Sequence, residues 1–154
     1  MPLRIKVNGI NEGDVIPKDY TCDGKNHSPE IEIAGTPTGT QSLALIVEDP
    51  DAPGGTFVHW VMYNIGPNVS RIQEKLERSE RTSDGFIQGG NDFGRTGYDG
   101  PCPPRGHGFH RYFFKLYALS SSLNIPGTAT REKLLKSMEG KILEEAQAMG
   151  RYRR

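Results

Sequence analysis

Two short segments of this 154-residue chain gather the residue types that could do chemistry. The first, DPDAPGGTFVHW, places Asp49 and Asp51 on either side of a proline and His59 eight residues after the second aspartate. The second, GPCPPRGHGFHRYFF, contains His110 and Tyr112. In both segments a loop stiffened by proline joins a strand-like aromatic stretch. If the two strands are neighbours, these five side chains converge at the mouth of one pocket.

The chemistry that suits this set is the binding of a small anion. Two histidines and a tyrosine hydroxyl can donate hydrogen bonds to phosphoryl or carboxylate oxygens. Nearby aspartates can hold a histidine tautomer or accept from an ammonium group of the same ligand. A zwitterionic phosphate ester satisfies both requirements. We expect His27 and His107 to be exposed loop residues, and Arg111, on the opposite face of its strand, to form a structural ion pair.

Other chemistries fit less well. A zinc site could use His59, His107, His110 and an aspartate, but H-x-x-H places its two histidines on opposite faces of a strand. Cys102 is a candidate nucleophile, although the prolines on both sides leave few donors around it. Phosphate-cradling glycine loops lead into a helix, whereas these glycines lead into a strand pattern. We therefore expect no metal, no cofactor and no catalytic residue. The plainest alternative for the first segment is a turn with solvated aspartates and a core histidine.

The charge of the chain is balanced. Lys and Arg together number 19, as do Asp and Glu, so the formal net charge is zero. This balance provides no electrostatic footprint for a nucleic acid or an anionic membrane. We interpret the basic ending, RYRR, as a frayed and solvated tail. The start, MPLRIKVNGI, lacks the pattern of a signal peptide, and no stretch is long and apolar enough to span a membrane, so we expect a cytoplasmic protein.

The two cysteines, Cys22 and Cys102, are separated by 80 positions. They form either two free thiols or one long-range disulfide. A cytosolic location favours thiols, but both cysteines lie in turn-rich segments that could meet. The sequence leaves this choice open.

The element pattern predicts a mostly β protein with one domain spanning residues 1–154. Residues 66–86 read as an exposed loop or a short helical turn. Residues 130–149 carry apolar side chains at helical spacing, which predicts one amphipathic helix capped by Thr130 and weakened by about 1 kcal/mol at Gly140. We expect an antiparallel sandwich with this C-terminal helix on one side. Five strands are predicted, at residues 3–7, 30–34, 42–49, 56–65 and 110–120.

At the two chemical segments the sequence resembles the phosphatidylethanolamine-binding protein family, which includes Raf kinase inhibitor protein. A third segment, YTCDGKNHSPEI, resembles the bacterial and archaeal branch. The resemblance implies a Greek-key β-sandwich, a small pocket for phosphate-like groups and a cis Ala52–Pro53 bond. By motif, the ligand-binding residues implied are Asp49, Asp51, His59, Pro104, His110 and Tyr112.

Three functions follow from these observations. The first is a regulatory protein that binds a small anionic ligand or a phosphorylated partner. The second is a serine protease inhibitor, because the resemblance implies that some family members inhibit such enzymes. Residues 66–86 are the candidate loop for insertion into a protease cleft. The third is a phosphoester hydrolase in which Asp49 orients His110 as a base. The resemblance also makes a homodimer an expectation.

Overall fold

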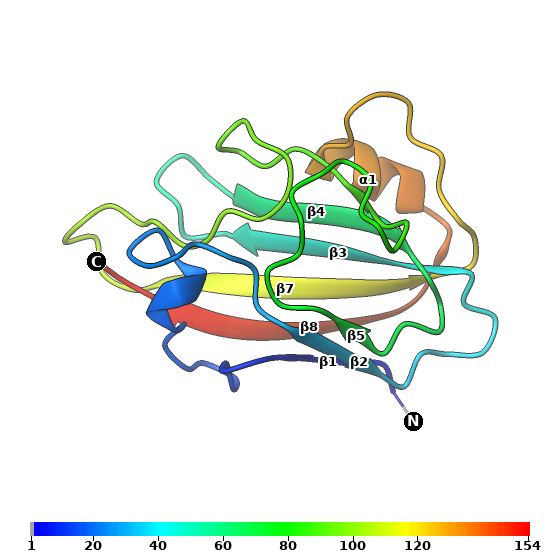
Figure 1. The fold of residues 1–154 in the computed structure, drawn as a ribbon, viewed down its shortest axis with the longest axis horizontal. Coiled ribbons are helices and arrows are strands. Elements are labelled where there is room, and N and C mark those ends of the chain that lie inside the picture. The colour runs from blue at the N-terminus through cyan, green and yellow to red at the C-terminus, as the bar shows by residue number, and fades with distance from the viewer. Residues whose placement is uncertain (1) are drawn as a thin grey trace.

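The computed structural model describes residues 2–154 as two antiparallel β-sheets packed face to face, with one helix on the outer face of the larger sheet (Figure 1). The larger sheet has the order β6-β4-β3-β7-β8 and the smaller one the order β1-β2-β5. A short 3₁₀ turn, Lys18–Tyr20, follows the first strand. The elements are β1 Arg4–Val7, β2 Ile31–Ala34, β3 Ser42–Asp49, β4 Phe57–Ile65, β5 Arg71–Ile72, β6 Ile87–Gln88, β7 His110–Leu119, α1 Arg131–Met138 and β8 Ile142–Tyr152. The predicted mostly β sandwich is confirmed, as are its five predicted strands to within a residue or so at each end.

Strand β3 is the central strand of the larger sheet, and both of its faces are covered. Leu43, Leu45 and Val47 face the core between the two sheets. Ala44 and Ile46 belong to a second core beneath α1. A strand that is buried on both faces needs a continuous apolar run rather than an alternating one, and SLALIVED supplies it.

The helix is attached to the sheet by packing and by a buried ion cluster. Leu134 and Met138 are fully buried in the second core. Beside them the Glu48 carboxylate lies 2.8 Å from Arg131 Nε and 3.2 Å from Lys115 Nζ. Two cations compensate the cost of burying this carboxylate, so the end of β3, the middle of β7 and the start of α1 are held together.

The C-terminal region departs from its prediction. The helix begins as expected, with the Thr130 side chain accepting from the N–H of Lys133, but it ends at Met138. A turn containing Gly140, with φ of +74°, reverses the chain into β8, which pairs with β7 along its length. The helix predicted to reach residue 149 is therefore wrong in its second half. Without β8, strand β7 would leave a long row of backbone N–H and C=O groups without hydrogen-bond partners. The free energy gained by pairing these groups exceeds the preference for a helix that the spacing of the later apolar residues indicates.

The last residues are also ordered parts of the fold rather than a frayed tail. Tyr152 is buried and pairs with His110 across β7 and β8. Its hydroxyl donates to Asp23 Oδ2 at 2.5 Å, and Arg154 Nε lies 3.2 Å from the other oxygen of the same carboxylate. The prediction of a solvated tail is thus wrong, because this end of β8 is tied to an N-terminal loop.

The segment 66–86 is mostly irregular, as predicted, and has only the two-residue strand β5 before β6 begins. Three apolar side chains, Ile72, Leu76 and Phe86, are buried and anchor it to the core between the sheets. The residues from 77 to 81 are exposed.

Candidate ligand-binding site

The two chemical segments meet because of the order of the strands. Strand β3 lies between β4 and β7, so Val47 is paired with Trp60 on one side and with Phe114 on the other. The end of β3, the start of β4 and the start of β7 therefore lie at the same end of the strands (Figure 1). A pocket of about 210 Å³ opens there, and it is lined by Asp49, Ala52, Pro53, Phe57, His59, Phe93, Cys102, Pro103, Pro104, His110 and Tyr112.

A chain of three polar side chains runs from the floor of this pocket to the surface. His110 Nδ1 lies 2.6 Å from Asp49 Oδ2, and both side chains are buried. The other ring nitrogen of His110 lies 2.5 Å from Nδ1 of the exposed His107. Because the carboxylate can only accept, it fixes the proton of His110 on Nδ1. His107 is an exposed loop residue, as predicted, but it is also the outer partner of His110.

His59 is held by a different partner. Its Nδ1 lies 2.6 Å from the backbone oxygen of Asp99, so this nitrogen carries a proton and the Nε2 atom is left as the acceptor of the neutral ring. Burial lowers the pKa of His59, and the hydrogen bond to the Asp99 backbone oxygen and the nearby carboxylates oppose this shift only in part. The pocket thus contains a neutral histidine beside the Asp49 carboxylate.

Aromatic rings form the remaining walls. The rings of Phe57 and Phe93 lie 5.1 Å and 5.6 Å from the ring of His59, and the Tyr112 ring lies 5.3 Å from it. Burial, together with the nearby Asp49 carboxylate, raises the pKa of Tyr112, so its hydroxyl keeps its proton and remains a donor. The site therefore combines a hydroxyl donor, two imidazoles and one carboxylate within apolar walls.

Asp51 has a different neighbour from the other predicted site residues. Both of its oxygens accept from the Arg111 guanidinium at 2.9 Å, and it also accepts from the Arg111 backbone N–H. The Arg111 hydrogen bonds lower the pKa of Asp51 to about 2. The predicted structural ion pair of Arg111 is confirmed. Among the described residues, Asp51 is outside the pocket lining, whereas Asp49, His59, Pro104, His110 and Tyr112 belong to it.

Several known proteins are similar to this chain over nearly its whole length. The family model described as phosphatidylethanolamine-binding protein matches residues 6–153. A UPF0098 protein of Aquifex aeolicus is 53% identical over 153 residues, covering 99% of this chain and 89% of that protein. A UPF0098 protein of Methanothermobacter thermautotrophicus is 46% identical, with 99% of each chain covered. The chain belongs to the phosphatidylethanolamine-binding protein family.

Solved structures of this family share the fold. A phosphatidylethanolamine-binding protein homologue from Chlamydia trachomatis is 37% identical, with a TM-score of 0.90 over 99% of this chain and 98% of that one. Escherichia coli YbcL, described as a member of the mammalian family, is 29% identical, with a TM-score of 0.92 over 100% and 99% of the two chains. These relatives place the chain in the bacterial and archaeal branch of the family.

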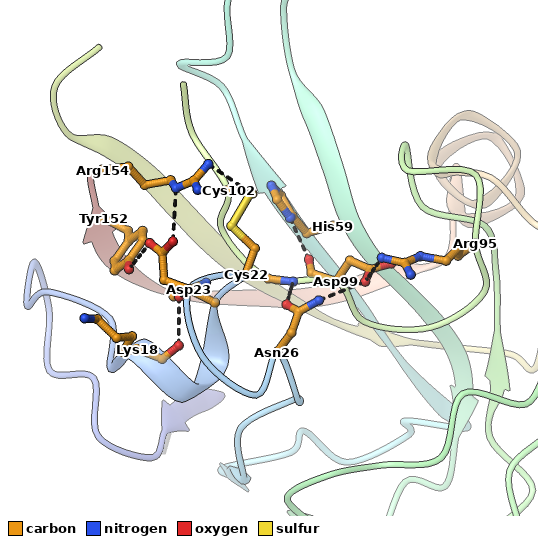
Figure 2. The surroundings of a disulfide bond; sticks show 12 residues. Lys18, Cys22, Asp23, Asn26, His59, Arg95, Asp99, Cys102, Tyr152 and Arg154 are labelled. Atoms are coloured by element: carbon orange, nitrogen blue, oxygen red, sulfur yellow. Dashed lines mark hydrogen bonds and ion pairs between the residues drawn. A yellow bond between two sulfur atoms is a disulfide. The ribbon is translucent and has the colours of Figure 1, made fainter. Parts of the chain in front are cut away.

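Several features of this family member's pocket were not predicted from its sequence. Cys22 and Cys102 form a disulfide, so the pocket wall is linked covalently to an N-terminal loop (Figure 2). Phe93 and Asp99 lie in the glycine-rich stretch that precedes the pocket-lining residues 102–104. Their roles can be recognised only from their neighbours in the structure. The Ala52–Pro53 bond is trans, which corrects the expected cis bond; trans is the lower-energy isomer unless the surrounding structure enforces the other.

Three further results concern the chain outside the pocket's polar core. His27 is half-buried, with Nδ1 3.2 Å from the Ser28 carbonyl oxygen, so its predicted exposure is wrong. Within residues 2–154, no three His, Cys, Asp or Glu side chains are grouped to hold a metal ion. In the same range no helix combines the length and apolar character needed to cross a bilayer.

Proposed function

We propose that the pocket binds a small ligand carrying a phosphoryl group, and that the protein acts by this binding rather than by catalysis. The observation that supports the proposal is the buried Asp49–His110 pair facing a pocket of about 210 Å³ together with His59 and Tyr112. A volume of this size suits a group of several heavy atoms, such as a phosphate ester of a short alcohol. The pocket would then read the phosphorylated end of a metabolite or of a partner.

In this proposal the ligand takes the place of His107. The His107 ring lies outside the pocket lining and supplies one nitrogen to His110. A phosphoryl hydroxyl in that position would donate to the free Nε2 of His110, because the Asp49 carboxylate holds the ring proton on Nδ1. The Tyr112 hydroxyl can donate to the same group.

The charge of the pocket favours a zwitterionic ligand over a simple anion. His59 is neutral, and Asp49 contributes a negative charge. A bare dianion would meet this carboxylate without compensation, whereas an ammonium group on the ligand would be attracted to it. The aromatic rings around His59 add cation–π attraction for the same ammonium. Phosphorylethanolamine has both charges.

The test is a calorimetric titration of O-phosphorylethanolamine and of inorganic phosphate into the wild type and two variants. Asp49→Asn keeps the acceptor for His110 and removes the negative charge, so phosphorylethanolamine should bind about tenfold more weakly, about 1.4 kcal/mol, while phosphate binding is unchanged or stronger. His110→Ala should lose both ligands. Asp84→Asn, a change in an exposed turn, is the matched control and should behave as wild type.

Two results would contradict the proposal. If neither ligand binds the wild type, the pocket is not a phosphoryl site. If Asp49→Asn weakens phosphate and phosphorylethanolamine equally, the ammonium group has been assigned to the wrong residue. Thermal unfolding of each variant shows whether a loss of binding reflects a loss of fold.

The serine protease inhibitor alternative involves a different part of the surface. Its candidate loop is anchored by Ile72, Leu76 and Phe86, which leaves the stretch 77–81 exposed for insertion into a protease cleft. An inhibitor of this kind would retain its activity in His110→Ala and lose it when Arg81 is replaced by alanine. The hydrolase alternative predicts turnover of an aryl phosphate by the wild type and none by His110→Ala.

A further inference from the structure

A second cleft, of about 370 Å³, lies between three loop segments around residues 25–28, 75–78 and 95–99. The linings of the two cavities share no residue, but Asp99 of the second cleft contacts His59 of the first pocket. The backbone oxygen of Asp99 accepts from His59, while its carboxylate holds the arginines of the second cleft. Figure 2 shows His59 and Arg95 approaching Asp99 from different sides. The two cavities are therefore distinct, and the ligand proposed above does not account for the second one.

The cleft carries an excess of positive charge in a protein whose formal net charge is zero. Four lining residues are cationic: Lys25, Lys75, Arg78 and Arg95. The lining contains one carboxylate, Asp99. Within the part of the chain that the structure describes, neither lysine ammonium makes an ion pair. Glu74 lies at the edge, 3.9 Å from His27 Nδ1 and in contact with the Tyr20 hydroxyl, and offsets only part of this excess.

The two arginine side chains are preorganised for ligand binding by hydrogen bonds within the protein. Arg95 donates from Nε and Nη2 to the two oxygens of Asp99, at 3.1 Å and 2.6 Å. Arg78 donates from Nη2 to the same carboxylate at 2.8 Å and from Nη1 to the Tyr98 carbonyl oxygen. Asp99 is buried, whereas the arginine side chains are 43% and 59% exposed. Each guanidinium therefore keeps N–H donors free for a ligand while its plane is held by a fixed anchor.

The backbone of the cleft gives an independent indication of a built site. Three non-glycine residues among those described have a positive φ, and two of them, Asn26 and Lys75, line this cleft. Asparagine tolerates this conformation, but for lysine it is unfavourable and persists only where the surroundings enforce it. The amide N–H of Lys75 donates to the Ser28 carbonyl oxygen at 2.9 Å, which holds the strained residue against the opposite wall.

We propose that this cleft is a second ligand site, which binds a multiply charged phosphoryl compound of the pyrophosphate or phosphate-monoester class. The two planar guanidiniums donate their free N–H groups to phosphoryl oxygens, and the two free ammonium groups neutralise the remaining charge. A singly charged carboxylate would leave most of the cationic excess uncompensated. The site needs no part of the Asp49–His110 pocket, so the two proposals can fail separately.

The test is an NMR titration of ¹⁵N-labelled protein with pyrophosphate at 0.15 M salt, where screening suppresses weak attraction to exposed charges. We expect saturable shifts at the amides of 25–28, 75–78 and 95–99 and at the Arg78 and Arg95 Nε–H groups. The double variant Lys25→Ala, Lys75→Gly removes both free ammonium groups, and glycine accepts the positive φ without strain. Its Kd for pyrophosphate should rise at least tenfold.

Two controls separate this site from its alternatives. Lys136→Ala removes an exposed lysine of α1 and should change the Kd less than twofold. Asp49→Asn alters the first pocket and should leave the shifts of the second cleft intact. The proposal is overturned if no resonance of the cleft shifts. It is also overturned if Lys136→Ala weakens binding as much as the double variant, since that marks non-specific attraction, or if the shifts occur only around His59 and His110.

Discussion

Three aspartates around the pocket have the same side chain and three different tasks. Asp49 is buried against His110 and faces the cavity. Asp51, only two residues later, is paired with Arg111 at the surface. Asp99 is buried beneath Arg78 and Arg95. The neighbours of each carboxylate decide its role, so Asp49 alone of the three is available to a ligand in the first pocket.

The pairing of Asp51 with Arg111 should make stability depend on pH. The guanidinium lowers the pKa of Asp51 from 3.8 to about 2, so the folded state favours the ionised form. This contribution is fully present above the unfolded value and is lost as the pH falls through the folded one. Because Arg111 is half exposed, we expect Asp51→Asn to cost only about 1 kcal/mol at pH 7, and the difference from wild type to shrink between pH 4 and pH 2.

Urea unfolding at a series of pH values measures this difference, with Asp84→Asn as the control for the loss of a surface carboxylate. A gap between wild type and Asp51→Asn that stays constant down to pH 2 would show that the ion pair is not its source.

At the scale of elements, the decisive feature is the reversal of the chain between α1 and β8. The helix ends after Met138, and Gly140 adopts a left-handed conformation in the turn. The strand that follows covers the edge of β7 and carries Tyr152 to the level of His110. The pocket-bearing end of β7 is thus supported by the last residues of the chain.

Gly140→Ala distinguishes this arrangement from a continuous helix by the sign of its effect. In a helix interior the substitution would stabilise the protein by about 1 kcal/mol. In the observed turn, where φ is +74°, the added Cβ should instead destabilise it by about 1 kcal/mol. No heavy atom lies within 4 Å of the new Cβ among the described residues, so the effect reports the backbone conformation alone.

Chemical denaturation of the variant measures this sign. Gly54→Ala is the matched control, because Gly54 also has open space around it but lacks a positive φ, so little change is expected. A stabilised Gly140→Ala protein would refute the turn.

At the scale of the whole molecule, one wall of the pocket is connected to both the N-terminal loop and the C-terminal residues. The disulfide connects Cys102 in the wall to Cys22 in the N-terminal loop (Figure 2). The neighbouring Asp23 contacts Tyr152 and Arg154 near the C-terminus. These contacts have large sequence separations, so they constrain the chain strongly once they are formed.

Removal of the disulfide should therefore have a large effect on stability. The bond joins residues 80 positions apart, and the chain-entropy model assigns a loop of this length roughly 4.5 kcal/mol. We expect the double variant Cys22→Ser, Cys102→Ser to lose this amount in urea unfolding. Wild type treated with dithiothreitol should fall to the same midpoint, and an unchanged midpoint after reduction would show that the bond does not stabilise the fold.

Local pattern was enough to predict much of this protein. The apolar run of β3 and the alternating faces of β7 locate the strands, since both are set by which side chains must be buried. The Pro- and Gly-stiffened loops beside them identified Asp49, Asp51, His59, His110 and Tyr112 as a group, and all of these except Asp51 line the pocket. Their residue types determined the kind of chemistry that the pocket can offer.

Tertiary structure alone decided the features that depend on partners far away in the chain. The spacing of residues 142–149 suits a helix, and only the unpaired edge of β7 made it a strand. Asp49 and Asp51 are interchangeable in the sequence, and only the position of Arg111 separates them. The pairing of Cys22 with Cys102 depends on two loops meeting. Periodicity records what a segment must bury, whereas register, ion pairs and cross-links depend on which surfaces come together when the whole chain folds.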